Sequence, residues 1–86
     1  MYHLYILECA DGSLYTGITV DLERRLREHN GLAGKNGKGA KYTRGRRPVK
    51  IVFSKKFRSR SRASIEESRI KKLSRAAKLE IIYLQF

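Results

Sequence analysis

The apolar stretch YHLYILEC, residues 2–9, constrains the fold more than any other part of this 86-residue chain. It is rich in residues that favour strands, and it is apolar at both odd and even positions. Successive side chains of a strand point to opposite faces of a sheet. One face would carry Leu4 and Ile6, and the other Tyr5, Leu7 and Cys9. Two apolar faces are typical of a central strand covered on both sides.

The remaining segments predict the order β-β-α-loop-β-α-α. Asp11-Gly12 favours a turn before a second strand at residues 14–19. Asp21 is expected to cap a helix that ends at Asn30-Gly31. Residues 31–47 hold five glycines and six basic residues, which predicts a flexible cationic loop with a short turn near 41–44.

A third strand is expected over residues 49–57, followed by a helix from near Ser61 to about Leu73. Ser74 can cap a last helix over residues 75–84. We therefore predict the α+β class, with a three-stranded, mainly antiparallel sheet flanked by three helices. The length predicts a single domain over residues 1–86.

The charge of the chain is strongly unbalanced, with 20 lysines and arginines against 8 acidic residues and a formal net charge of +12. This excess predicts a polyanionic partner, most simply nucleic acid. A membrane surface fits less well, because no long basic amphipathic helix with a Trp- or Phe-rich face is present. Cys9 is the only cysteine, which excludes an internal disulfide and suits a reducing cytoplasm.

Two tyrosines, Tyr5 and Tyr15, lie on the predicted strands that flank the Asp11-Gly12 turn. One interpretation is cross-strand aromatic packing, and the other is a pair of phenols that line one functional site. A two-residue Asp11-Gly12 loop would place Tyr15 opposite Glu8 and separate the phenols onto opposite faces. We predict the other register, with an odd-length loop or a bulge, Tyr15 opposite Cys9, and both phenols on one face.

Arg25 and His29 lie four residues apart on the first predicted helix and so share a face. They form either a solvated helix face or a functional pair, because arginine binds phosphate and neutral imidazole accepts protons. Glu66 falls within a later apolar stripe, and Glu67 falls on its edge. A glutamate there is either solvated and paired, as Glu67 with Lys71, or a ligand for a hard cation at the rim of a cleft.

The basic segments GKNGKGAKYTRGRR and RSRSR suit phosphate contacts and carry no pattern for reading bases. We therefore expect DNA to be bound through its backbone with little base readout. The predicted nucleic-acid-binding residues are Lys35, Lys38, Lys41, Tyr42, Arg44, Arg46, Arg47, Arg58, Arg60 and Lys71.

These residues, taken together, resemble the motifs of the GIY-YIG nuclease domain. The segment 3–5, HLY, corresponds to the GIY element, and the segment 15–17, YTG, to the YIG element. Arg25, His29 and Glu67 correspond to the arginine, the histidine and the metal-binding glutamate of the family. The resemblance covers essentially the whole chain and extends to small stand-alone bacterial proteins that are little more than this domain.

The resemblance implies cleavage of DNA phosphodiester bonds with one Mg²⁺ or Mn²⁺ ion on Glu67. A tyrosine, kept near its phenolate form by Arg25 and the metal, would activate water. We assign this role to Tyr5, with Tyr15 orienting it, although the family allows the reverse. Arg25 would stabilise the charge of the transition state, and His29 would hold or relay a proton.

Gly17 would allow its strand to come close to a helix or to the substrate, where a Cβ would clash. The leading hypothesis is an endonuclease that acts on structured or single-stranded DNA in repair or recombination. The alternatives are a catalytically inactive nucleic-acid-binding module and a small basic protein that docks acidic partners. All five candidate positions retain chemically competent residues, which favours the endonuclease.

Overall fold

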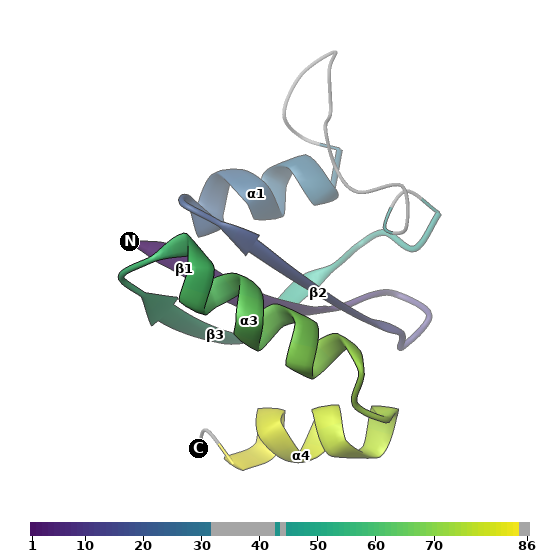
Figure 1. Ribbon diagram of the computed structural model, residues 1–86. Helices are drawn as coiled ribbons and strands as arrows, with labels where there is room; N and C mark the ends of the chain where they lie inside the picture. Colours follow the sequence, from purple (N-terminus) through teal and green to yellow (C-terminus); the bar gives the residue numbers. More distant parts are fainter. Residues whose placement is uncertain (32–42, 44, 85–86) are drawn as a thin grey trace.

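The computed structural model describes residues 1–31, 43 and 45–84, and Figure 1 shows how the elements are arranged. The predicted α+β architecture is confirmed, with three antiparallel strands in one sheet and three helices in the described residues. The elements are β1 (Tyr2–Glu8), β2 (Leu14–Thr19), α1 (Leu22–His29), β3 (Lys50–Phe57), α3 (Arg60–Lys71) and α4 (Arg75–Leu84).

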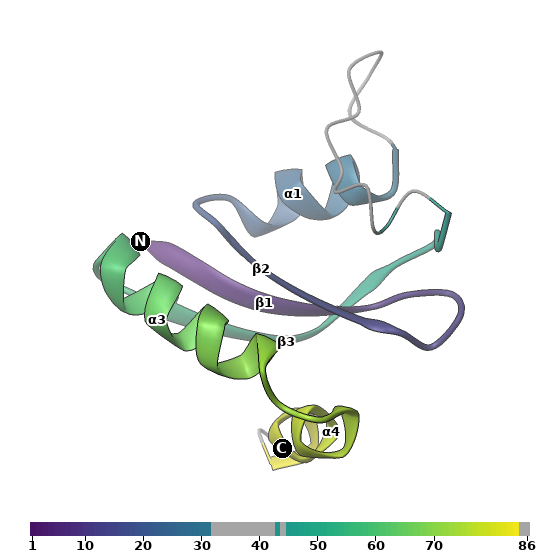
Figure 2. The same ribbon diagram turned by 45° about the vertical axis from the view of Figure 1, so that its right-hand side comes forward.

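The sheet has the strand order β2-β1-β3, so β1 is the central strand, as its two apolar faces predict. α1 covers one face, and α3 and α4 lie on the other (Figure 2). The face under α1 buries Tyr5, Leu7 and Cys9 against leucines of that helix. The opposite face buries Leu4 and Ile6 against isoleucines of α3 and α4. The sheet thus separates two small cores, both built on β1.

The turn between β1 and β2 determines which tyrosines share a face. Tyr15 lies opposite Leu7, and Tyr5 lies opposite Gly17, so the two phenols are on the same face, as predicted. The expected pairing of Tyr15 with Cys9 is wrong, because Cys9 instead donates its N–H to the carbonyl oxygen of Ser13 at 2.9 Å. Gly12, at φ +82°, closes a loop that is longer than two residues.

Each of the three described helices begins directly after a residue whose side chain caps its N-terminus. The side chain of Asp21 accepts a hydrogen bond from the backbone of Arg24, which fixes the start of α1. Ser59 caps α3 in the same way, so this helix begins at Arg60 rather than near Ser61, and it ends at Lys71 rather than Leu73. Ser74 caps α4 as predicted, through the backbone of Ala77.

The segment before β3 is fastened to the rest of the molecule by side chains. Asn30, which ends α1, donates to the carbonyl oxygen of Val49 at 3.1 Å and accepts from its N–H at 2.8 Å. Arg46 forms an ion pair with Asp11 at 3.0 Å. Of the turn expected near residues 41–44, only Thr43 is described. No helix in the described part of the chain is long and apolar enough to cross a membrane.

A candidate active-site cleft at the edge of the sheet

A cleft of about 340 Å³ lies beside β2, and α1 and α3 both contribute to its walls. Four of the five predicted site residues line it, each from a different element. They are Tyr5 of β1, Tyr15 of β2, Arg25 of α1 and Glu67 of α3. The fifth, His29, lies behind Tyr5 and is completely buried. The fold thus brings together residues that are spread over most of the chain.

Gly17 lets the phenol of Tyr5 reach this cleft. A Cβ at Gly17 would lie 2.5 Å from Oη of Tyr5 and 3.2 Å from the ring of Tyr15. The close approach predicted for Gly17 therefore exists, but the neighbour is the cross-strand tyrosine rather than a helix. The phenol of Tyr5 thus lies against the one position of β2 that has no side chain.

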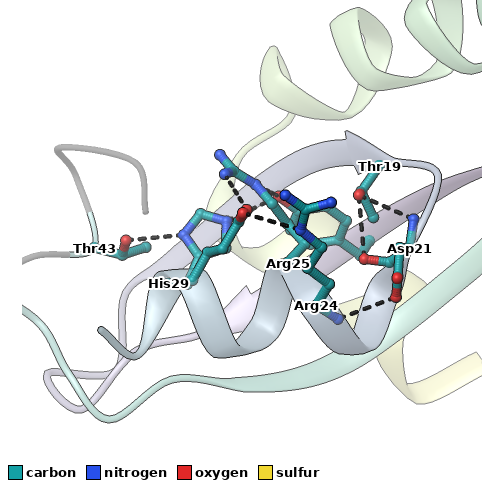
Figure 3. Close-up of polar contacts among 8 residues, drawn as sticks. Thr19, Asp21, Arg24, Arg25, His29 and Thr43 are labelled. Carbon is teal, nitrogen blue, oxygen red and sulfur yellow. Dashed lines mark hydrogen bonds and ion pairs between the residues drawn. The ribbon is translucent and has the colours of Figure 1, made fainter. Parts of the chain in front are cut away.

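A chain of hydrogen bonds runs inward from Tyr5. Oη of Tyr5 lies 2.9 Å from Nε2 of His29, and Nδ1 of His29 lies 2.9 Å from Oγ1 of Thr43. Figure 3 shows the imidazole between α1 and Thr43. The exposed fraction is 2% for Tyr5 and zero for the other two residues. Water does not reach His29 or Thr43. Each buried polar atom of this hydrogen-bonded series therefore needs its neighbour in the series as a hydrogen-bond partner.

Burial sets the protonation states of Tyr5 and His29. Burial raises the pKa of Tyr5 to about 12, although the hydrogen bond and charge of Arg25 act in the opposite direction. Burial and the charge of Arg25 lower the pKa of His29 to about 4. At neutral pH the protein alone therefore holds a protonated phenol beside a neutral imidazole. Arg25 lowers the pKa of Tyr5, as expected, but burial outweighs this effect in the protein alone, and the contribution expected from a bound metal ion stays a prediction.

Arg25 lies at the junction between the cleft and the buried chain. Its Nε donates to Oη of Tyr5 at 3.4 Å, and its Nη1 donates to Glu28 at 2.9 Å. The guanidinium also lowers the pKa of the Glu28 carboxyl, so Glu28 stays ionised. Arg25 is therefore held in place from its own helix, and it also lines the cleft.

Tyr15 is the more exposed of the two phenols. Its ring centroid lies 6.4 Å from that of Tyr5 and 5.1 Å from that of His29. The three rings form one aromatic cluster on the α1 face of the sheet. The packing interpretation of the tyrosine pair is confirmed, and the two tyrosines also line one cleft. That this cleft is a functional site stays a prediction.

The two adjacent glutamates of α3 differ in their surroundings. Glu67 lines the cleft and pairs with Lys71 at 3.5 Å, whereas the carboxylate of Glu66 pairs with Arg69. In the described residues no group of three or more His, Cys, Asp or Glu side chains could hold a metal ion. One carboxylate beside two phenols suits a hard cation that keeps most of its water ligands, which is the usual state of protein-bound Mg²⁺.

The predicted nucleic-acid-binding residues fall into three groups. Arg60 lines the cleft, and Arg58 is exposed just before α3. Arg46, Arg47 and Lys71 have partners within the protein: Asp11, the carbonyl oxygen of His29, and Glu67. Phosphate contacts by these residues remain a prediction. Lys35, Lys38, Lys41, Tyr42 and Arg44 lie outside the described residues.

Thr43 is the site residue that the sequence did not single out. It lies in the glycine-rich basic segment, where the charges attract attention and a lone threonine carries no recognisable pattern. The sequence offers only an indirect indication that His29 has a further hydrogen-bond partner. A buried histidine needs a partner for each of its two ring nitrogens, and Tyr5 can satisfy only one of them.

Comparisons with known proteins identify the family of this chain. The model of the GIY-YIG catalytic domain matches residues 1–80. A UPF0213 protein of Halobacterium salinarum is 53% identical over 78 residues, which cover 91% of this chain and 95% of that protein. A UPF0213 protein of Oceanobacillus iheyensis is 51% identical over 84 residues, 98% of this chain and 92% of its own length.

Two solved structures are also similar. The solution NMR structure of a UPF0213 protein from Bacillus halodurans has a TM-score of 0.61 and 46% sequence identity. That of a protein from E. faecalis has a TM-score of 0.62 and 39% identity. Each match covers 98% of this chain and 85% of the other. The similarity therefore extends over the whole architecture.

Proposed function

Because the chain belongs to the GIY-YIG catalytic domain family, a family of nucleases, we propose that it is a divalent-metal-dependent DNA endonuclease. The observation that carries this proposal is the cleft shared by Tyr5, Tyr15, Arg25 and Glu67. Hydrolysis of a phosphodiester needs a base for the attacking water and positive charge for the transition state. The cleft offers a residue for each of these needs.

Tyr5 is the proposed general base. Tyr5 lines the cleft, and its hydroxyl lies 2.9 Å from Nε2 of a neutral imidazole, which can take the phenolic proton as the phenol takes one from water. The pKa values of about 12 for Tyr5 and about 4 for His29 make this transfer unfavourable in the protein alone. The additional positive charge that would favour loss of the phenolic proton is the charge of a divalent metal ion, which Glu67 would hold in the same cleft.

Arg25 and Tyr15 have supporting roles in this proposal. The guanidinium of Arg25 donates to Oη of Tyr5, so it stabilises a phenolate there, and its charge also faces the phosphate position. A charge-assisted contact of this kind strengthens as negative charge develops on the phosphate oxygens. Tyr15 packs beside Tyr5 and orients its ring and the attacking water.

Glu67 is the proposed ligand for one Mg²⁺ or Mn²⁺ ion, with water and the substrate phosphate as the other ligands. The ion supplies Lewis acidity at the phosphate and at the leaving oxygen when it is bound. Glu67 pairs with Lys71 in the protein alone and lies at the cleft wall.

DNA is the proposed substrate, in structured or single-stranded form, in cytoplasmic repair or recombination. The net charge of +12 supports a polyanion, and the arginines near the cleft support contacts to the phosphate backbone. A sequence-reading element would require side chains that reach base edges in a groove, and the proposed contacts do not include one.

The test is incubation of branched, duplex and single-stranded DNA with Mg²⁺ or Mn²⁺ and the wild-type protein, beside Tyr5→Phe and Glu67→Ala. We expect metal-dependent cleavage by the wild type that both variants lose. Cleavage by Tyr5→Phe at the wild-type rate would assign the base to Tyr15. Equal, background-level cleavage by all three proteins would leave a nucleic-acid-binding module without turnover.

A further inference from the structure

We propose that Thr43 is a positioning residue that holds His29 in the tautomer with its proton on Nδ1. This tautomer leaves Nε2 as the acceptor for the proton of Tyr5. The inference deepens the proposed function and rests on it for its catalytic consequence. Its structural part, the tautomer of His29, can be tested in the protein without DNA or metal.

The direction of the hydrogen bonds follows from the donors in the chain. Arg25 is a cation that only donates, and it donates to Oη of Tyr5. With one lone pair of Oη engaged in this way, the phenolic proton is directed to Nε2 of His29 at 2.9 Å. A neutral imidazole that accepts at Nε2 carries its hydrogen on Nδ1. That hydrogen then needs an acceptor, and Oγ1 of Thr43 lies 2.9 Å away.

Thr43 is held firmly enough to fill this role. Its carbonyl oxygen accepts from the N–H of Arg46 at 3.0 Å, and the carbonyl oxygen of Arg46 accepts from the N–H of Ala10 at 2.9 Å. The side chain of Arg46 is paired with Asp11. Thr43 is therefore connected to the β1–β2 turn, and its side chain is fully buried against His29.

His29 is held independently at its backbone. The Nε of Arg47 donates to the carbonyl oxygen of His29 at 2.6 Å, and Asn30 joins the end of α1 to Val49. The position of the ring thus does not depend on Thr43 alone. Once Tyr5 directs its proton to Nε2, the hydroxyl of Thr43 supplies the acceptor that the hydrogen on Nδ1 needs, because a buried Nδ1–H without an acceptor is costly.

The wrong tautomer would stop the proposed proton transfer. With the hydrogen on Nε2, His29 would donate to Oη of Tyr5 and could not accept the phenolic proton there. Tyr5 would lose its proton acceptor although every cleft residue stayed in place. The hydroxyl of Thr43 therefore acts on the reaction only through His29, without touching the substrate.

The tautomer can be read from the ring nitrogens of His29 by ¹⁵N NMR at pH 7, without DNA or metal. The chain has two histidines, so His3→Gln assigns the signals. We expect the Nδ1–H tautomer in the wild type and in Thr43→Ser, and a shift toward Nε2–H in Thr43→Val, which keeps the shape but removes the acceptor. An Nε2–H tautomer in the wild type, or an unchanged tautomer in Thr43→Val, would overturn the proposal.

Cleavage assays test the catalytic consequence. Positioned proton transfer typically contributes about 10²–10⁴-fold to a rate, so we expect kcat of Thr43→Val to fall by about 10²-fold with KM little changed and Thr43→Ser to restore it. Equal kcat for Thr43→Val and wild type would contradict the catalytic role. If the wild type does not cleave DNA, the proposed function fails, while the NMR result still decides the tautomer.

Discussion

Tyr5 and Gly17 face each other across β1 and β2, and the missing side chain of Gly17 is the space through which the phenol reaches the cleft. The two residues come from different strands and are twelve positions apart in the chain. The phenol of Tyr5 can occupy its position only because residue 17 has no Cβ. The hydroxyl of Tyr5 then lies between the buried imidazole of His29 and the open cleft.

The first prediction concerns this contact. In Gly17→Ala the new Cβ would lie 2.5 Å from Oη of Tyr5, and the ring cannot move freely because it is hydrogen-bonded to His29. We expect a loss of about 1–3 kcal/mol in the free energy of unfolding, as for other overpacked sites, and loss of cleavage. Urea denaturation and the DNA cleavage assay measure both effects.

Gly45→Ala is the matched control, because nothing lies within 4 Å of the Cβ that it would add. We expect its stability to stay within about 0.5 kcal/mol of the wild type, as for ordinary surface changes. Equal stabilities of the two alanine variants would show that the Tyr5 ring does not depend on the space at Gly17.

The second prediction is a pH dependence of stability that arises from His29. Its pKa falls from 6.5 to about 4 on folding, so between these values the unfolded chain binds a proton that the folded protein does not. The stability from this residue is therefore fully present above about pH 6.5 and is lost as the pH falls toward 4. At about 1.4 kcal/mol per unit, the loss is about 3 kcal/mol.

Urea denaturation at several pH values, compared between the wild type and His29→Gln, isolates this contribution. The difference in unfolding free energy between the two proteins should shrink by about 3 kcal/mol as the pH falls from about 6.5 to 4. A difference that is constant over this range would mean that His29 titrates normally in the folded protein.

The third prediction separates the two glutamates of α3. Glu67 lines the cleft, whereas Glu66 pairs with Arg69. Glu67→Gln should abolish metal-dependent cleavage and weaken the binding of Mn²⁺, because an amide is a poorer ligand for a hard cation than a carboxylate. Glu66→Gln should keep both properties. Both properties are measured by titration with Mn²⁺ in the presence of DNA, one through the cleavage rate and the other by calorimetry. Equal effects of Glu66→Gln and Glu67→Gln on cleavage and on Mn²⁺ binding would exclude a specific role for Glu67.

The fourth prediction concerns Arg60, the cleft arginine contributed by α3. If Arg60 contacts a phosphate, Arg60→Gln should reduce the slope of log K against log salt by about 0.7–0.9. Arg69→Gln removes the same charge from the same helix, but Arg69 already has Glu66 as its partner. We expect less than half the effect there. Fluorescence anisotropy with labelled DNA at several salt concentrations provides both slopes.

The elements of the fold were largely predictable, because local signals are strong here. The two apolar faces of residues 2–9 identify the central strand, and Asp21 and Ser74 mark helix starts through their capping bonds. The register of the first hairpin was only partly predictable. An Asp-Gly pair signals a turn but does not reveal how many residues the loop holds, so the shared face of Tyr5 and Tyr15 was correct and the partner Cys9 was not.

The protonation states of the site could not be predicted from the sequence. Whether Arg25 or burial dominates the pKa of Tyr5 depends on how much water reaches the phenol, and this depends on packing from three separate elements. Thr43 was not predicted as a site residue for a similar reason. Its partner His29 lies fourteen positions away across a segment without regular spacing, so only the folded chain brings the two together.

The two edge strands of the sheet, β3 and β2, differ in how they are protected against pairing with a strand of another molecule. β3 exposes Lys50, Lys55 and Lys56, and lysines on an edge strand discourage pairing with a strand of another molecule. β2 carries no charged residue, and its outer side borders the cleft. A foreign strand that added to β2 would therefore lie beside the cleft. If the cleft binds nucleic acid as proposed, the bound nucleic acid and a foreign strand would compete for this one edge.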